Sequence, residues 1–591
     1  MEENIKLAYR NMKKNDGSTT PGIDGKTIEH LAKMTEKEVI ELVRNKLEWY
    51  TPKAIRRVEI DKGNGKKRPL GIASIEDRLI QQCILQVLEP ICEAKFHDRS
   101  NGFRPNRGVE NALAQAEKLI QSNKLYIVVD IDIKGFFDNV SHGKLLKQLW
   151  TIGIQDKKLI SIISAMLKGE IAGIGFPEKG TAQGSIISPL LSNVVLNELD
   201  WWIASQWEFM PTRHVYKEAI KANGTQSKSK KYRALRSSTL KECFIVRYAD
   251  DFKIFCRKHK DAVVMFEATK QWLKTRLGLD ISPEKSKIVN LKHSYSEFLG
   301  FRIKVHKKGK DTKCKPPVDK YVVKSHISEK ALKKIKTNAK ERIIAIQKTN
   351  GSRAGEFAIR DYNSFVMGVQ NYYSMATCVN PDMQTLAYEI KTSIKIRLNT
   401  RVKRRTNEAL TPYLSERYGR SKELRFINGV PLVPIGYVQH RVPLHKKAVV
   451  NKYTVEGRKE IHKQLETVDI ERVHELMKNP ISDETVEFND NCVSLFVAQR
   501  GKCAICKLPL TLENMRCVRK IPKSCGGDDK YNNLIIVHKE MERLIKSQDN
   551  KEIKRILNKY KLESNQRRKV NTIRKNAGLE EIDVKALDKE L

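Results

Sequence analysis

The sequence predicts a multidomain α+β protein. The chain has 591 residues, more than one hydrophobic core usually serves, and 40% of them are hydrophobic against 31% charged. Short apolar runs bounded by turn residues predict strands, as in LYIVVDIDIKGFFDNV from Leu125 to Val140. From about residue 325 to 405 the apolar residues recur at intervals of three and four, which predicts a helical bundle.

The first hundred residues predict helices around a small pair of strands. Residues 1–50 read as a helix, a loop rich in Gly, Pro and Asp, and a second helix. The segment from Ala54 to Ile91 reads as a strand, a basic Gly-rich turn, another strand and an amphipathic helix. Further helices are expected after residue 140.

Two adjacent carboxylates, Asp250 and Asp251, lie between apolar runs in FIVRYADDFKIFC, which predicts a β-hairpin with both residues at its turn. Adjacent carboxylates repel, so at least one pKa rises unless a cation neutralises the site, and Mg²⁺ prefers such oxygen ligands. Asp132, at the end of a predicted buried strand, supplies a third carboxylate, and such a set can hold two metal ions for nucleotidyl transfer. For the turn alone, an exposed Asp-Asp pair without a catalytic role is the commoner alternative.

The remainder of the chain divides by composition. Residues 205–241 are rich in Lys, Arg, Ser and Asn, which predicts an inserted, solvated loop region. Residues 406–490 mix short elements with turns, and a last unit begins near residue 490. In the helical region two apolar stripes are expected to form core: Leu332, Ile335, Ala339 and Ile343, and then Phe365, Val366, Val369, Tyr372 and Tyr373.

The charge balance points to a polyanionic partner. Lys and Arg number 111 against 70 Asp and Glu, a net charge of +41, and nucleic acid is the expected partner. No apolar run approaches the length of a membrane span, and the N-terminus lacks the apolar segment of a signal peptide. The 11 cysteines are scattered apart from one Cys-x-x-Cys, so we expect an intracellular protein, cytoplasmic in a bacterium or inside an organelle, with no membrane partner.

An ordered series of motifs resembles group II intron-encoded reverse transcriptase/maturases over about residues 50 to 305. In chain order the motifs are RRVEIDKGNGKKRPLGI, EDRLIQQ, NGFRPNRG, VDIDIKGFFDNVSH, GTAQGSIISPLLSNVVLNELD, VRYADDFKIF, SPEKSKIVN and FLGF. The resemblance implies a right-hand polymerase fold with fingers, palm and thumb. It divides the chain into an N-terminal extension (1–50), fingers and palm (51–310), a helical thumb or maturase domain (311–405), a DNA-binding region (406–490) and an HNH endonuclease-type domain (491–591).

The resemblance also assigns roles to single residues. Asp132, Asp250 and Asp251 match the catalytic aspartates that bind two Mg²⁺ ions. Phe137 matches the aromatic steric gate that excludes a ribose 2′-hydroxyl, and its alternative is a phenylalanine of the core.

Four further residues match contacts to the incoming dNTP. Lys62 and Arg68, in the basic turn, match the residues that clamp the triphosphate, a role that suits cationic side chains; a solvated charge cluster is the alternative. Gln183 matches the border of the nucleotide pocket, and Lys285 matches a palm lysine near the triphosphate.

The chain departs from the family pattern at three places near these residues. Ala182 and Ser185 stand in GTAQGS where the family has GTPQGG, and Ala73 replaces a usual proline. Loss of a proline and a glycine is expected to alter the loop near the nucleotide. None of the changes removes a predicted metal ligand.

The C-terminal unit resembles an HNH endonuclease that has lost its catalytic base. Cys503 and Cys506 have the spacing of zinc ligands. Cys517 and Cys525 are available for a second pair but lack that spacing, so the sequence does not predict a complete tetrahedral site. The family's His-His pair is replaced by Val518 and Arg519. At the remaining family positions Asn533 and His538 are kept, whereas Glu542 stands where the last histidine is usual. Without a histidine to activate water, DNA cleavage is not expected.

The activity that the resemblance implies is RNA-directed DNA polymerisation combined with help in splicing the protein's own group II intron. The intron RNA is then copied into DNA during target-primed retrohoming. The implied partners are intron RNA, target DNA and the RNA/DNA template-primer duplex. Three alternatives stay open: an RNA-binding maturase that acts only in splicing, a reverse transcriptase of another class, and an RNA-templated RNA polymerase.

Overall fold

The computed structural model describes residues 1–61, 67–217, 219–220, 226–311, 316–349, 353–404, 410–463 and 469–583. They form two compact units, each assembled from segments far apart in the sequence. The first unit comprises residues 1–94, 141–191 and 449–591, and the second comprises residues 95–140 and 192–448. Both units mix helices and strands, in agreement with the predicted α+β class.

The N-terminal part of the first unit is helical, as the sequence predicts. Its core includes Tyr9, Leu31 and Leu79. Thr35 begins one helix with a capping box, and the Ser74 side chain accepts a backbone hydrogen bond at the start of another. The elements here are α1 (Glu2–Lys13), η1 (Asp16–Thr19), α2 (Ile28–Ala32), α3 (Glu36–Glu48), the antiparallel pair β1 (Arg56–Asp61) and β2 (Lys67–Ile72), α4 (Ile75–Glu93), α7 (His142–Ile152) and α8 (Lys157–Leu167).

The C-terminal segment packs against these helices through α18 (Val486–Ala498). The Tyr9 hydroxyl donates to Glu487 Oε2 at 2.6 Å, and Lys13 Nζ lies 3.0 Å from Asp490 Oδ2. A second core, formed by residues between Leu476 and Ile573, includes most of the remaining elements. The remaining elements of this segment are α16 (Val455–His462), α17 (Ile470–Lys478), β15 (Met515–Arg519), η3 (Lys523–Cys525), η4 (Tyr531–Asn533), β16 (Leu534–His538), α19 (Lys539–Lys546), α20 (Asn550–Tyr560) and α21 (Ser564–Asn576).

The second unit is built on a four-stranded antiparallel sheet in the order β6-β7-β3-β8. Its strands are β3 (Ile127–Ile131), which is buried along its whole length, β6 (Cys243–Tyr248), β7 (Asp251–Cys256) and β8 (Lys287–Asn290). Helix α11 (His259–Trp272), extended by the π-helical turn η2 (Leu273–Leu277), packs against all four strands. Three further helices are α5 (Val109–Gln121), α6 (Phe136–Asn139) and α9 (Ser188–Ser205), which enters this unit at Ser192.

The segment expected to be a solvated loop, residues 205–241, contains regular structure. Helix α10 (Ser229–Arg236) buries Leu235 and sets the Tyr232 ring against Phe244. The strands β4 (Ala219–Ile220) and β5 (Gln226–Ser227) pair with each other. The prediction was therefore wrong for α10, because two apolar residues among many cations are enough to attach a short helix to the sheet.

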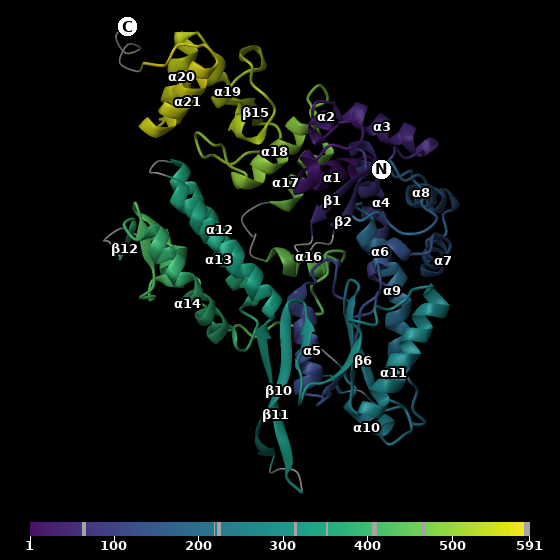
Figure 1. The fold of residues 1–591 in the computed structure, drawn as a ribbon. Coiled ribbons are helices and arrows are strands. Elements are labelled where there is room, and N and C mark those ends of the chain that lie inside the picture. The colour runs from purple at the N-terminus through teal and green to yellow at the C-terminus, as the bar shows by residue number, and fades with distance from the viewer. Residues whose placement is uncertain are drawn as a thin grey trace. The chain divides into compact units, whose positions relative to one another are not determined.

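A long hairpin and three helices follow the sheet. β10 (Phe301–Asp311) pairs with β9 (Ser296–Phe298) and with β11 (Val318–Ile327), and Figure 1 shows β10 and β11 as the two longest strands. α12 (Glu329–Lys348) buries Ile335, Ala339 and Ile343 of the first predicted stripe, whereas Leu332 is half-buried. α13 (Arg353–Tyr373) buries Val366 of the second stripe, but Tyr372 is 38% exposed.

Helix α13 turns polar residues inward to hold the segment that follows α14 (Val379–Leu398). Asn363 Nδ2 donates to Pro431 O, and Gln370 Nε2 donates to Pro434 O. The elements after α14 are β12 (Val402–Lys403), α15 (Pro412–Tyr418), β13 (Arg425–Ile427) and β14 (Val430–Leu432). In the part of the chain that the structure describes, no helix combines the length and the apolar character needed to cross a membrane.

Candidate active site

The two adjacent aspartates lie at the turn of the hairpin β6–β7, as predicted. Tyr248 pairs with Asp251, so the loop consists of Ala249 and Asp250 alone. Ala249 has φ +57°, a left-handed conformation that costs an alanine about 1–2 kcal/mol. The surrounding structure must therefore hold this turn.

The third aspartate is adjacent to them. Ile131 at the end of β3 pairs with Phe252, so the next residues along the two antiparallel strands, Asp132 and Asp251, are neighbours. Desolvation by the surrounding protein raises the pKa of Asp251 to about 6, although Asp251 is the exposed first residue of β7. Lys253 opposes that shift, and the charges of Asp130, Asp250 and Asp132 add to it. The structure thus brings together the three carboxylates that the sequence singled out.

The loop before β8 fixes Asp132. Its carbonyl accepts from Ser282 N at 2.7 Å, and its N–H donates to Ser286 Oγ at 3.2 Å. Lys285, in the same loop, places Nζ 2.9 Å from Asp132 Oδ2, and this hydrogen bond raises the pKa of the lysine. Both side chains are partly exposed, at 61% for Lys285 and 44% for Asp132, so this pair can exchange partners with solutes.

A buried charge pair lies behind the aspartates. Lys253 Nζ of β7 lies 2.8 Å from Asp130 Oδ1 of β3, and the two residues face each other in the ladder. The Ser296 hydroxyl hydrogen-bonds the same carboxylate, at 3.0 Å from Oδ1. Phe298 contacts Lys253 by its ring, with Nζ 5.3 Å from the centroid. The signal for this pair in the sequence is that Asp130 and Lys253, which have opposite charges, each interrupt an apolar run.

Arg247 holds the Ala249–Asp250 turn from inside the protein. Its guanidinium is fully buried and pairs with Asp200 of α9, with Nη2 2.7 Å from Oδ2. Its Nη1 donates to Asn193 Oδ1 at 2.9 Å and to Ala249 O at 2.8 Å. The bond to Ala249 fastens the strained turn to α9.

Gly102 closes the same turn from the other side. A Cβ added at this glycine would lie 2.2 Å from Ala249 N, so no side chain fits there. Asn193 Nδ2 donates to Gly102 O at 2.8 Å, which connects this contact to the arginine network. Sequence patterns did not identify Arg247, Asp200, Asn193 or Gly102, since nothing local marks a buried ion pair.

Phe137 lies in α6, five residues after Asp132. It is half-buried, and its ring meets Phe136 edge-on at a centroid distance of 5.3 Å. Phe136, by contrast, is 2% exposed and belongs to the core. The partial exposure of Phe137 separates it from an ordinary core phenylalanine.

Two of the predicted nucleotide contacts meet in the first unit. Arg68 Nε donates to Gln183 Oε1 at 2.7 Å, and Gly71 N donates to Gln183 O at 2.6 Å. Gly184 has φ +110°, which only glycine adopts easily, and its Cα lies close to Gly71. Lys62 lies outside the described residues.

The departures near Gln183 fit this packing. The Ser185 hydroxyl donates to Gln81 Oε1 of α4 at 3.0 Å, a bond that a glycine could not make. Ala182 lies against Gly71, where a Cβ would be 3.1 Å from the Ala182 methyl. The loop is therefore tied to both β2 and α4 with the residues present.

The carboxylate oxygens of Asp132, Asp250 and Asp251 are suitable ligands for a divalent cation, although the three side chains do not converge on one point. Within the described ranges, no three His, Cys, Asp or Glu side chains group closely enough to hold a metal ion. Asp132 is instead paired with Lys285, and Asp251 carries a raised pKa that a nearby cation would lower again. Three neighbouring carboxylates offer the oxygen ligands that Mg²⁺ prefers.

The cysteines of the C-terminal segment do not assemble a zinc site in the described residues. Cys503 Sγ accepts from His538 N at 3.3 Å, and a hydrogen bond with Cys506 lowers the pKa of Cys503 to about 6. Cys517 is hydrogen-bonded to Cys492 instead, and Cys525 is exposed. Among the described residues no second pair of ligands groups with Cys503 and Cys506, so the residues present do not fit tetrahedral zinc.

Arg519, at the position expected for a nuclease histidine, is locked in ion pairs. Its Nη2 lies 2.7 Å from Asp529 Oδ1, and a second, closer pair joins it to Glu484. Its guanidinium also lies 4.3 Å from the centre of the Phe488 ring. Although burial opposes it, these carboxylates raise the pKa of Arg519, so the group cannot act as a base. Val518 beside it is buried in the core.

The sequence of this chain is similar to those of known proteins. Residues 60–303 match the family described as reverse transcriptase (RNA-dependent DNA polymerase). The group II intron-encoded protein LtrA of Lactococcus lactis subsp. cremoris is 31% identical over 420 residues, which cover 63% of this chain and 69% of that protein. Protein YkfC of Escherichia coli (strain K12) is 31% identical over 303 residues, 49% of this chain and 76% of that protein. Nuclear intron maturase 2, mitochondrial, of Arabidopsis thaliana is 24% identical over 174 residues, 22% of this chain and 23% of that protein.

The matched region contains every element of the sheet that carries the aspartates. It runs from the end of β1 to β10 and includes Asp132, Asp250 and Asp251. The similarity to LtrA is longer than this region, at 420 residues. The chain belongs to the family of group II intron-encoded reverse transcriptase/maturases.

Proposed function

We propose that the three carboxylates at the ends of β3 and β7 are the polymerase active site of this reverse transcriptase. The observation that carries the proposal is the register of the sheet, which makes Asp132 and Asp251 neighbours although 119 positions separate them in the sequence. Asp132, Asp250 and Asp251 would hold two Mg²⁺ ions. When bound, the ions supply activation of a primer 3′-hydroxyl and charge stabilisation on the α-phosphate and the leaving pyrophosphate of a dNTP.

The protein's own side chains prepare this site. Arg247 and Gly102 set the position of Asp250 and Asp251 through the turn, and Ser282 and Ser286 set the backbone of Asp132. Lys285 neutralises Asp132 before substrate arrives and is free to swing to a triphosphate oxygen afterwards, because its ammonium is largely exposed.

The nucleotide contacts follow from the same proposal. Arg68 and Gln183 form one hydrogen-bonded pair, so the cation that would grip the triphosphate is aligned by the residue that would border the base. Lys62, which follows β1 in the sequence, would add a second cation. Phe137, half-buried on α6, would exclude a 2′-hydroxyl by filling its volume.

We assign the wider fold by the same reasoning. Residues 1–50 would be the N-terminal extension, 51–310 the fingers and palm, 311–405 the thumb and 406–490 a DNA-binding region. The helices α12 to α14 and the net charge of +41 suit RNA binding, because folded RNA offers phosphates and 2′-hydroxyls to cationic surfaces. The protein would bind its intron RNA, assist its splicing, and copy it into DNA from a primer at a DNA target.

Primer extension on an RNA template tests the active site. Asp250→Asn is expected to reduce incorporation of dNTPs by at least about a thousandfold, since it removes a metal ligand from the chemical step. Glu267→Gln, which removes an exposed carboxylate of α11 that pairs only at 3.5 Å with Lys270, serves as the matched control. Equal inactivity of the parent protein and Asp250→Asn would favour a maturase that acts only in splicing.

The same assay tests the gate. Phe137→Ala is expected to raise the use of ribonucleotides relative to dNTPs, because the volume of the ring becomes available to the 2′-hydroxyl. Phe136→Leu provides a control in the core beside it. An unchanged ratio in Phe137→Ala would remove Phe137 from this role.

For the C-terminal segment, 491–591, we propose a nuclease-like domain that does not cleave DNA. The β15–β16 hairpin followed by α19 has the strand-strand-helix order of HNH enzymes, but Arg519 occupies the base position. Incubation with supercoiled DNA and Mg²⁺ or Mn²⁺ is expected to leave the DNA intact. Nicking that disappears in Arg519→Ala would overturn this assignment.

A further inference from the structure

Helix α21 is anchored to the C-terminal core along one face. Val570 and Ile573 belong to that core, and Arg574 beside them is only 3% exposed. Arg574 Nη1 donates to the carbonyls of Leu544, at 3.0 Å, and Ser547, at 2.7 Å. These carbonyls lie at the end of α19, where helical carbonyls lack partners of their own, so the bonds fix α21 rigidly.

The opposite face of α21 carries polar and cationic side chains. They recur at intervals of three and four, so they form one stripe along the helix, and none is aliphatic or aromatic. Among the described residues, neither Arg568 nor Lys569 pairs with a carboxylate. The stripe, which we call the basic stripe, consists of Asn565, Arg568, Lys569, Thr572, Lys575 and Asn576.

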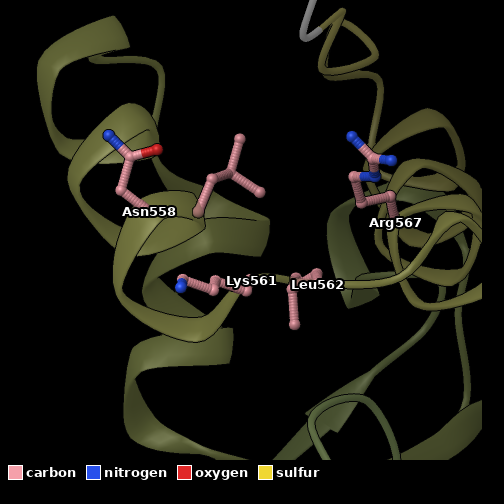
Figure 2. Close-up of a pocket in the computed structure, with 5 residues that line it drawn as sticks. Asn558, Lys561, Leu562 and Arg567 are labelled. Atoms are coloured by element: carbon pink, nitrogen blue, oxygen red, sulfur yellow. The ribbon is translucent and has the colours of Figure 1, made fainter.

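A pocket adjoins the basic stripe where α20 meets α21. Its volume is about 380 Å³, and it is lined by Leu557, Asn558, Lys561, Leu562 and Arg567. Figure 2 shows Asn558 and Lys561 on one side and Arg567 on the other, with the pocket between them. Two cations and an amide around a cavity suit phosphate oxygens, which accept such hydrogen bonds.

The charge of this region is one-sided. Residues 550–576 contain ten Lys or Arg and two Glu. Of the ten cations, Arg574 is used inside the protein, Arg555 pairs with Glu540, and Lys575 lies 3.9 Å from Glu581. An excess of this size, displayed on a rigid helix, favours a polyanion over a protein partner with a mixed surface.

We propose that the basic stripe and the pocket form a docking surface for double-helical DNA, with α21 in the major groove and a backbone phosphate in the pocket. The major groove of B-DNA is about 12 Å wide and admits a helix, which is about 10–12 Å across with its side chains. Double-helical RNA has a deep, narrow major groove that excludes a helix, so DNA is the better fit. Asn565 and Asn576 are side chains of the type that read base edges, and Arg568 and Lys569 suit phosphates.

This inference goes beyond the polymerase proposal, because it concerns a surface that contains none of the three aspartates. A charge-reversal variant of the full-length protein tests it. Arg568→Glu/Lys569→Glu changes the stripe, and Lys157→Glu/Lys539→Glu, at exposed positions outside residues 550–576, changes the net charge equally. Affinity for a fluorescein-labelled DNA duplex is measured by anisotropy over a range of salt concentrations, and a duplex RNA of equal length is measured in parallel.

The stripe variant is expected to bind duplex DNA roughly tenfold more weakly than the matched control. Its slope of log K against log salt should be smaller by about 2, one for each lost phosphate contact. Its affinity for duplex RNA should equal that of the control, and its primer extension on an oligonucleotide template should be unchanged.

A second variant, Lys561→Ala/Arg567→Ala, removes the pocket cations without introducing repulsion, and it should also weaken DNA binding selectively. Equal DNA affinity of the stripe variant and its control would overturn the proposal. A loss that is as large for RNA as for DNA would also overturn it, and would assign the surface to RNA. Circular dichroism of each variant checks that the helices are intact. Loss of primer extension in the Asp250→Asn protein with DNA binding retained would show that the two proposals stand independently.

Discussion

The aspartate site and the nuclease-like hairpin treat their charged residues in opposite ways. At the ends of β3 and β7, three carboxylates are neighbours, and desolvation by the surrounding protein, with smaller contributions from the charges of Asp130, Asp250 and Asp132, raises the pKa of Asp251. At β15, the charged residue in the expected base position, Arg519, is satisfied by two carboxylates and an aromatic ring. Perturbed ionisable groups such as Asp251 are typical of reactive sites, whereas a charge that is fully paired, such as that of Arg519, is typical of a structural role.

The largest expected effect tests whether the aspartates depend on their buried support. Arg247→Leu leaves Asp200 charged and unpaired in the core and should destabilise the protein by about 3–5 kcal/mol. The double variant Arg247→Leu/Asp200→Leu removes both charges and should recover most of that stability in urea denaturation. Its primer extension should stay well below that of the parent, because Ala249 O has still lost its donor.

Asp382→Asn is the control for the Arg247 variants. Asp382 accepts hydrogen bonds from Ile327 N and His326 in the same unit, far along the chain from the turn. It should cost stability and leave the rate of nucleotide addition per folded molecule nearly unchanged. Full activity in the stable double variant would show that the turn holds its shape without Arg247.

Much of the aspartate site was predictable from the sequence, because its residues lie in short-range sequence patterns. The Asp-Asp turn and the buried strand before Asp132 are marked by short-range patterns, so the hairpin and the strand were found correctly. Arg247 and Asp200, in contrast, are 47 positions apart and look like ordinary surface charges. Only the fold brings them together, and a single sequence gives no sign of such a pair.

The same limit explains what the sequence missed elsewhere. The division into compact units places the C-terminal segment with the N-terminal helices, through contacts such as that of Tyr9 with Glu487, 478 positions away. The α10 helix was missed because its apolar residues are few. The spacing of Cys503 and Cys506 indicated zinc, but further ligands depend on which side chains the fold brings near them. Cys517 is hydrogen-bonded to Cys492 instead.

The next largest effect on stability is expected at Arg519. Arg519→Leu leaves Glu484 and Asp529 without their main partner, in partly buried surroundings, and should cost about 2 kcal/mol of unfolding free energy. Arg516→Leu, on the same strand, is the control: its carboxylate partner Glu542 is 3.7 Å away and its side chain is 46% exposed, so the cost should stay below about 0.5 kcal/mol. Equal losses in thermal or urea denaturation would mean that Arg519 is an ordinary surface charge.

At the aspartates a substitution is expected to raise the stability of the protein, by less than the loss expected for Arg519→Leu. The pKa of Asp251 is about 6 in the fold and lies above its unfolded value, so its protonated form is favoured, and stability from this group is lost as pH rises from about 4 to 6. Asp251→Asn should therefore stabilise the metal-free protein at pH 7 and above, by about 1 kcal/mol after allowance for solvent screening at this exposed position. The gain should vanish near pH 4. Melting temperatures in EDTA across this pH range measure it, and a destabilised Asp251→Asn protein at pH 8 would contradict the comparison drawn above.

The smallest effect on stability, and the finest test of unsatisfied charge, lies at Lys285. Lys285→Met removes an exposed ion pair and should change the unfolding free energy by less than about 0.5 kcal/mol. If the lysine competes with Mg²⁺ for Asp132, the half-saturating Mg²⁺ concentration in primer extension should fall severalfold. If the lysine then moves to the triphosphate, the KM for dNTP should rise at the same time. Lys274→Met removes a similarly exposed pair, with Asp280, and should change neither quantity. A higher Mg²⁺ requirement in Lys285→Met would mean that the ammonium helps to assemble the carboxylates and does not compete with Mg²⁺ for Asp132.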